Sequence, residues 1–135
     1  MNYLISEVAK KLDITIHTLR YYDKEGLLPF VERSQNGVRK FRESDVEAIK
    51  IIQCLKVTGM PIKEIKEFIA WSLEGDSTLK ERYNMFLERK AAVKAQLEEL
   101  NRTMEVIHYK CEYFEKAVKA GTEEIYHDKK LINFN

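Results

Sequence analysis

The strongest constraint on this fold is a segment between residues 78 and 119 that lacks helix-breaking residues. It contains no proline and no glycine, the two residues that most disfavour a helix interior. At about 1.5 Å per residue, a helix of about 40 residues would be about 60 Å long. A break at residues 74–77 precedes the segment and Gly121 follows it. The sequence therefore predicts one long helix in the second half of the chain.

Apolar residues along this helix recur at alternating spacings of three and four, which is the heptad pattern of a coiled coil. The apolar stripe consists of Tyr83, Phe86, Val93, Leu97, Leu100, Met104, Ile107, Cys111, Phe114 and Val118. Lys90 is the polar residue that interrupts it. A single helix cannot bury such a stripe, and the preceding head is too small to cover it. We therefore predict a homodimer joined through residues 76–121, with a short C-terminal tail at residues 122–135.

Two shorter helices are predicted between residues 44 and 74. Gly59 would end the first of them, and Pro61 suits the first turn of the second. Their apolar residues, which are expected to face a core, are Val46, Ile49, Ile52, Leu55, Ile62, Ile65, Phe68 and Ile69. Caps are expected at Ser6, at Ser44 with Glu47, and at Thr78 with Glu81.

The first 42 residues have the pattern of a winged helix-turn-helix. Val8 and Leu12 of a short first helix can pack against a second helix that begins after Thr15, a good N-cap. The Asn-Gly pair at residues 36–37 is typical of a tight hairpin turn in which both residues have positive φ. The returning strand would carry Arg39, Lys40 and Arg42. Two short helices followed by a basic wing form a known DNA-reading geometry.

Several motifs follow one another along the first half of the chain. They are Ile5-Ser6-Glu7-Val8-Ala9, Thr18-Leu19-Arg20-Tyr21-Tyr22-Asp23, Gly26-Leu27-Leu28, Asn36-Gly37-Val38-Arg39 and the segment LKVTGMPI at residues 55–62. This ordered set resembles the MerR family of bacterial transcription regulators, closely over residues 1–75 and in architecture beyond them. The resemblance implies an all-α fold with a small β-hairpin wing. Residues 1–75 would form the winged helix-turn-helix head, and the long dimerisation helices would pair as an antiparallel coiled coil.

The motifs indicate which residues contact DNA. In helix-turn-helix proteins the N-terminal residues of the second helix lie nearest the bases, which here are Thr15, His17 and Thr18. The resemblance adds Arg20, Tyr21, Tyr22, Arg39, Lys56 and Lys66, chiefly as contacts to the DNA backbone. The alternative for Tyr22 is a place in the core. For the arginines and lysines, the alternative is an ordinary solvated surface.

No motif in the sequence indicates catalysis. It has no nucleophile–base arrangement, no glycine-rich phosphate loop and no metal-binding spacing of Cys or His. We therefore expect neither an enzyme nor a cofactor. Metal-sensing relatives place two or more cysteines near the far end of the dimer helix, where this chain has Cys111 alone, with His108 and His127 as possible helpers. Since Cys111 falls on the apolar stripe, burial as a small hydrophobe is the better interpretation.

Cys54 is the candidate sensor residue. It lies on the same side of its predicted helix as Lys50, away from the apolar residues, and a nearby lysine favours the reactive thiolate. Residues 53–56, 59–60 and 73–76 resemble a small subgroup of the family linked to aldehyde and other electrophile stress. In that subgroup a single cysteine at the matching position has been proposed as the sensor. The alternative is a free cysteine that fills space between the head and the partner's helix.

Composition gives weaker information. The net charge is +1, and residues 1–42 hold eight Lys or Arg against five Asp or Glu. This local excess is in keeping with DNA binding but is too small to indicate it alone. The sequence has no long apolar run and no signal-peptide pattern at its N-terminus, so we expect a soluble, cytoplasmic protein.

These observations predict a homodimeric transcription regulator that binds a palindromic or near-palindromic promoter site. It would distort the spacer between the promoter elements and so activate or repress RNA polymerase on the same promoter, with a small electrophile as the candidate effector. One alternative is a DNA-bending architectural or recombination accessory factor. The other is a coiled-coil adaptor for protein interactions, in which the basic wing is incidental.

Overall fold

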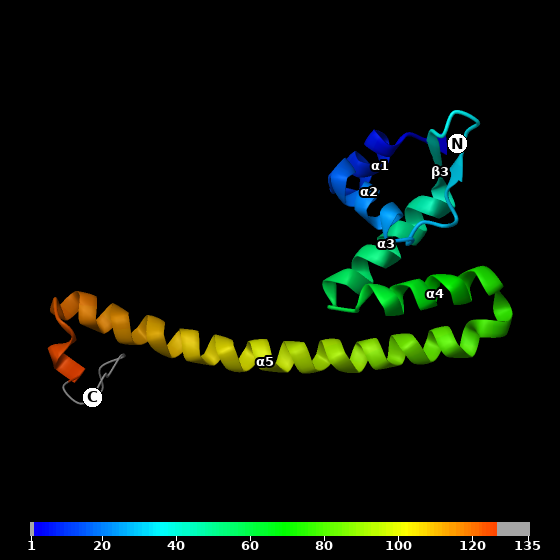
Figure 1. Cartoon of the computed structure of the whole chain (residues 1–135). Helices are drawn as coiled ribbons and strands as arrows, with labels where there is room; N and C mark the ends of the chain where they lie inside the picture. Colours follow the sequence, from blue (N-terminus) through cyan, green and yellow to red (C-terminus); the bar gives the residue numbers. More distant parts are fainter. Residues whose placement is uncertain (1, 127–135) are drawn as a thin grey trace. The chain divides into compact units, whose positions relative to one another are not determined.

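The computed structural model describes residues 2–126 and is mostly helical, with a three-stranded antiparallel sheet (Figure 1). The chain divides into two compact units, with the boundary between Ala92 and Val93. The first unit contains β1 (Asn2–Tyr3), α1 (Ile5–Leu12), α2 (Ile16–Lys24), β2 (Glu32–Arg33), β3 (Arg39–Arg42), α3 (Glu43–Val57), α4 (Ile62–Glu74) and the 3₁₀ turn η1 (Asp76–Thr78). α5 (Leu79–Ala120) begins in this unit and ends in the second, where η2 (Glu123–Tyr126) follows it. A helical head with a β wing and a long C-terminal helix confirms the predicted fold class.

The sheet is built around β3. This strand pairs antiparallel with β1, where Tyr3 is opposite Phe41, and with β2, where Arg33 is opposite Arg39. Phe41 is fully buried, while its neighbours Lys40 and Arg42 are exposed. This alternation is what a strand with one face on a core requires. Phe41 therefore fixes the wing onto the helices.

The wing turn differs from the prediction. The Ser34 N–H donates to the Val38 carbonyl at 2.7 Å, and the Gly37 N–H donates to the Ser34 carbonyl at 2.9 Å. Gly37 has a φ of +79°, whereas Asp13 is the sole non-glycine with positive φ in the described chain. The expectation of positive φ at Asn36 was therefore wrong. A longer loop built on a four-residue turn needs only one left-handed residue, and the glycine supplies it.

The caps of α1 and α2 test two sequence predictions. The Thr15 hydroxyl accepts the Thr18 backbone N–H at 3.0 Å, so the predicted cap of α2 is confirmed. α1 begins one residue before Ser6, which is therefore not its cap. Instead the Leu4 N–H donates to the Glu7 side chain at 2.8 Å. A carboxylate three residues after the cap satisfies this free N–H without a Ser or Thr at the cap.

α3 is also capped by an acidic side chain and not by the predicted serine. This helix begins at Glu43, so Ser44 is not its cap. Here the Arg42 N–H donates to Asp45 at 2.8 Å. The predicted Thr78 cap of α5 was also wrong, because Thr78 belongs to η1, which runs directly into α5. Its hydroxyl hydrogen-bonds to the carbonyls of Trp71 and Gly75 and accepts from Arg82 Nε. Thr78 is buried at the corner between α4 and α5, where it ties the end of one helix to the start of the next.

The core of the first unit follows the predicted helix faces. The buried residues from the predicted set are Val46, Ile49, Ile52, Leu55, Ile65, Phe68 and Ile69, and Ile62 is partly buried against them. Val8, Leu19 and Tyr22 join the same cluster from α1 and α2. α4 runs alongside the first turns of α5 (Figure 1), where the rings of Phe68 and Phe86 meet edge to face at 5.4 Å. The start of α5 is therefore part of the head's packing.

The second unit is the remainder of α5 and a short return. At the C-terminus of α5, Gly121 has a φ of +75°, and η2 brings Tyr126 back to stack on Tyr113 with ring centroids 4.1 Å apart. The Tyr113 hydroxyl also donates to Glu123 at 2.8 Å. Residues 122–126 of the predicted tail thus fold against α5. Residues 127–135, with His127, lie outside the described part of the chain.

Candidate DNA interface

The N-terminal turn of α2 carries the predicted base-contacting residues. Thr15 is engaged as the cap, and its hydroxyl lies 2.9 Å from that of Thr18. Three further side chains of α2 are exposed, namely His17, Arg20 and Tyr21. The exposed side chains give α2 a polar outer face with an arginine and two aromatic rings. This face is what a helix needs to enter the major groove.

Tyr22 lies in the core, where 6% of the residue is exposed. Its pKa is raised above the usual value, first by burial and then by the neighbouring Tyr21. The ring is therefore chiefly a packing element that fixes α2 on the head. This matches the alternative given by the sequence.

Tyr22→Phe should change the alkaline stability of the protein. Because the pKa of Tyr22 is higher in the folded state, the unfolded chain loses this proton first, and the free energy of unfolding falls as the pH rises above about 10. Phenylalanine has no proton to lose, so the variant should lose less stability than the wild type between about pH 9 and about pH 11. Thermal unfolding followed by circular dichroism measures this difference. Parallel pH profiles would contradict it.

The wing arginine Arg39 is bound to α2. Its guanidinium forms an ion pair with the Asp23 carboxylate, and Arg33 Nη2 lies 3.6 Å from the same carboxylate oxygen. The Arg39 side chain is 15% exposed, whereas that of Arg33 is 59% exposed. Arg39 is therefore held at the junction of wing and helix and is not an ordinary solvated arginine. The sequence prediction missed its partner Asp23.

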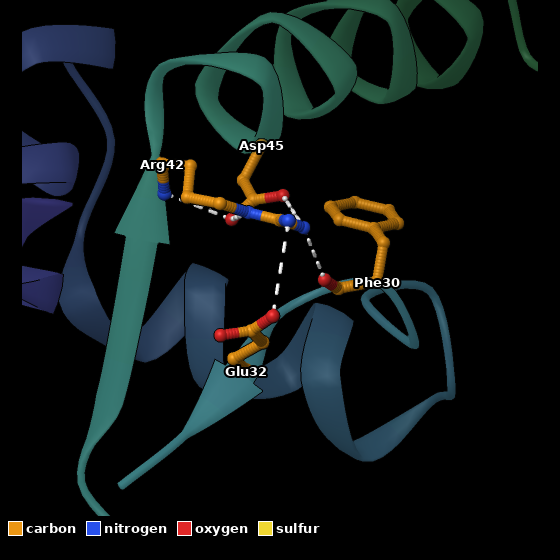
Figure 2. Close-up of polar contacts among 4 residues, drawn as sticks. All are labelled: Phe30, Glu32, Arg42 and Asp45. Atoms are coloured by element: carbon orange, nitrogen blue, oxygen red, sulfur yellow. Dashed lines mark hydrogen bonds and ion pairs between the residues drawn. The ribbon is translucent and has the colours of Figure 1, made fainter. Parts of the chain in front are cut away.

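A second network joins the wing to α3 (Figure 2). The Arg42 guanidinium donates to Asp45 at 3.1 and 3.3 Å and to the Phe30 carbonyl at 2.9 Å, and it lies 3.9 Å from the Glu32 carboxylate. Asp45 is 2% exposed. Hydrogen bonding to Asp45 raises the pKa of Arg42 above its ordinary value. Arg42 therefore has a structural role, because its side chain connects β3, the segment before β2 and the start of α3.

The two predicted lysine contacts differ in their surroundings. Lys56 on α3 is half-buried, and Lys66 on α4 is exposed. Gly26 follows α2 with a φ of +80°, and a Cβ added there would lie 3.2 Å from Lys66 Cε. The Lys66 side chain therefore covers the end of α2. It brings a positive charge from α4 to the helix that is predicted to read DNA.

Both cysteines are free and exposed. Cys54 lies on the outer face of α3, as the sequence predicts, and Lys50 on that helix is paired with Glu47 at 3.0 Å. Cys111, which is a member of the apolar stripe on α5, is exposed in the single chain. No group of three or more Cys, His, Asp or Glu suited to a metal ion occurs within residues 2–126. The same residues include no helix with the length and apolar character needed to cross a lipid bilayer.

Comparison with protein families gives two overlapping matches. Residues 3–70 match the model described as MerR HTH family regulatory protein, and residues 46–108 match the model described as MerR, DNA binding. Together they cover the sheet, α1 to α4 and most of α5. The first match spans the residues that form the proposed interface on α2 and the wing.

Individual relatives agree with this assignment. A protein of Haemophilus influenzae described as an HTH-type transcriptional regulator is 41% identical over 122 residues, which are 90% of each chain. The crystal structure of HiNmlR, described as a MerR family regulator lacking the sensor domain and bound to promoter DNA, matches with a TM-score of 0.85 and 40% identity over 93% of this chain and 99% of that one. A MerR family regulator from Bacillus thuringiensis matches with a TM-score of 0.78 and 42% identity over 82% of this chain and 97% of that one.

These relatives are transcription regulators and not enzymes, and the matches span both the head and most of the long helix. The chain is a DNA-binding transcriptional regulator and belongs to the MerR family.

Proposed function

We propose that the protein acts as a homodimer in which two heads bind one palindromic or near-palindromic promoter site, the operator. The observation that carries this proposal is the exposure of the apolar stripe on α5. Six stripe residues are half or more exposed in the single chain, namely Tyr83, Leu97, Leu100, Met104, Ile107 and Val118. Burying apolar surface contributes about 25 cal/mol per Å², so this stripe favours association.

A second copy of α5 is the partner that fits this stripe. The stripe keeps heptad spacing, and coiled-coil partners bury such residues by packing knobs into holes. Antiparallel pairing of two such helices would place the heads at opposite ends. A two-fold symmetric dimer of this kind predicts two half-sites with matching symmetry in the DNA.

The proposed action on DNA is distortion of the promoter spacer. With two heads on one duplex, part of the binding free energy would be spent on bending and untwisting the DNA, a form of indirect readout. This would realign promoter elements that are spaced too far apart and let RNA polymerase use them. The family membership supports this mechanism over the architectural factor and the adaptor, since the relatives regulate transcription.

Transcription in vitro from the promoter upstream of this gene tests the mechanism. The protein should footprint the spacer and change the yield of transcript in the presence of RNA polymerase. A promoter whose spacer is shortened to the ordinary length should be transcribed well without the protein. If the shortened promoter still needs the protein for transcription, realignment is not its role.

We further propose a small electrophile as the effector and Cys54 as its target. The exposed thiol on α3 supports this, because a reagent can reach it without unfolding the head. Adduct formation at Cys54 would change the surface that α3 presents to the rest of the dimer. Cys54 as a packing residue between the head and the partner's helix is the competing proposal.

Cys54→Ser should abolish a response to a small reactive aldehyde in the same transcription assay. Cys111→Ser is the matched control, since it removes the other free thiol of the described chain. The sensor proposal expects aldehyde to raise transcription with wild type and Cys111→Ser but not with Cys54→Ser. If all three proteins footprint the promoter and none responds, Cys54 is a packing residue.

A further inference from the structure

Asp23 pairs with two arginines of the wing. This residue lies in the last turn of α2, and its carboxylate binds the Arg39 guanidinium and is 3.6 Å from Arg33 Nη2. Asp23 is 26% exposed, and the more buried of its two arginines is Arg39, the predicted phosphate contact. One carboxylate is therefore shared between two guanidinium groups at a surface predicted to meet a polyanion.

The position of the pair links α2 to the wing. Arg33 and Arg39 are direct partners across the ladder of β2 and β3, where like charges repel. Asp23 offsets this repulsion from the neighbouring helix. Asp23 and Arg39 also line a hollow of about 380 Å³ between α2 and the wing, with Arg20 on its wall. A phosphate that enters the hollow meets Arg39 already bound to a carboxylate.

We propose that Asp23 limits the affinity of the head for DNA by competing with backbone phosphates for Arg39. A DNA phosphate can bind the Arg39 guanidinium only if it displaces the Asp23 carboxylate. On random DNA, contacts to the backbone supply nearly all of the affinity, so this competition weakens binding. On the operator, base contacts by α2 hold the wing against the backbone and favour the exchange of partners. The exchange breaks the Asp23–Arg39 ion pair, so Asp23 lowers affinity for the operator at least as much as affinity for random DNA.

Asp23→Asn tests this directly, since it removes the charge and keeps the shape of the side chain. Fluorescence anisotropy with a random-sequence duplex should show binding at least about threefold tighter than wild type. The slope of log K against log salt should steepen by about 0.9 for each head that gains a phosphate contact. The gain on the operator should be at least as large, because there the wild type has to break the Asp23–Arg39 ion pair to bind. Unchanged or weaker binding to random DNA would overturn the proposal.

Two control variants separate this role from net charge. Glu105→Gln removes one exposed carboxylate from a stretch of α5 that carries no predicted DNA contact, and it should leave binding to random DNA as in wild type. An equal gain in both single variants would overturn the proposal. The double variant Asp23→Asn with Arg39→Gln should lose the gain, because Asp23 acts through Arg39. A gain that persists without Arg39 would also overturn it.

Arg39→Gln alone covers the case in which Asp23→Asn fails to fold, as shown by a thermal melt. If Arg39 is withheld on random DNA, its loss should weaken operator binding more than random-DNA binding. Equal losses on the two duplexes would show that Arg39 is an ordinary phosphate contact, and the proposal would fall. This comparison depends on DNA binding by the head and not on the promoter mechanism.

Discussion

Leu100→Glu should convert the protein to monomers and reduce its affinity for the operator by about 100-fold or more. Leu100 is 65% exposed in the single chain and lies near the middle of the apolar stripe. In an antiparallel pair, each protomer would bring a glutamate into the buried seam, where an unpaired charge is costly. Without the dimer, the second head no longer binds at the high effective concentration that the first head gives it. Sedimentation equilibrium and operator titrations measure the two effects.

Ala95→Glu is the matched control for this variant. Ala95 lies five residues from Leu100 on the same exposed stretch of α5, at a heptad position opposite the stripe. It introduces the same charge, so it should leave both the mass in solution and operator affinity close to wild type. If Leu100→Glu remains a dimer, the stripe is not the seam. If both variants are monomers, dissociation results from added charge anywhere on α5 and is not evidence that the stripe is the seam.

Phe41→Ala should destabilise the head by about 3–5 kcal/mol. Phe41 is 0% exposed on the central strand of the sheet, so truncation removes a buried ring and leaves a cavity beneath the wing. Since small domains are stable by about 5–15 kcal/mol, this is a large part of the total. Urea unfolding at a fixed protein concentration, followed by circular dichroism, measures the change. Operator binding should fall with the folded fraction of the head.

Val38→Ala is the control in the same hairpin. Val38 is 52% exposed, so its truncation removes little buried surface and should change the free energy of unfolding by less than about 0.5 kcal/mol. If Phe41→Ala unfolds at the same urea concentration as wild type, the wing is not held by its buried face. The polar network of Arg42 and Asp45 would then be the main anchor of the wing.

The helical architecture could be predicted from sequence because periodicity is a local signal. The apolar faces of α3 and α4 and the long α5 follow from spacings of three and four, and they are found where expected. The starts of helices were less predictable. Leu4 and Arg42 carry no capping oxygen, and the acid three residues later in each case, Glu7 or Asp45, accepts the free N–H instead.

The candidate interface could be predicted only in part. Thr15, Arg20 and Arg39 are found on the surface formed by α2 and the wing. Their pairing could not be predicted, because Asp23 and Arg39 are 16 residues apart and meet only through the fold. The same holds for Arg42 and the Phe30 carbonyl, which are 12 residues apart. Motifs indicate which side chains are present, whereas tertiary contacts determine which of them are already engaged before DNA arrives.

Two heads, joined through α5, are expected to bind one promoter site. The most direct test is the mass of the protein–operator complex by light scattering, together with a hydroxyl-radical footprint of the same complex. We expect two chains on each duplex and a footprint that is symmetric about its centre. One chain on each duplex with a footprint lacking two-fold symmetry would contradict the account.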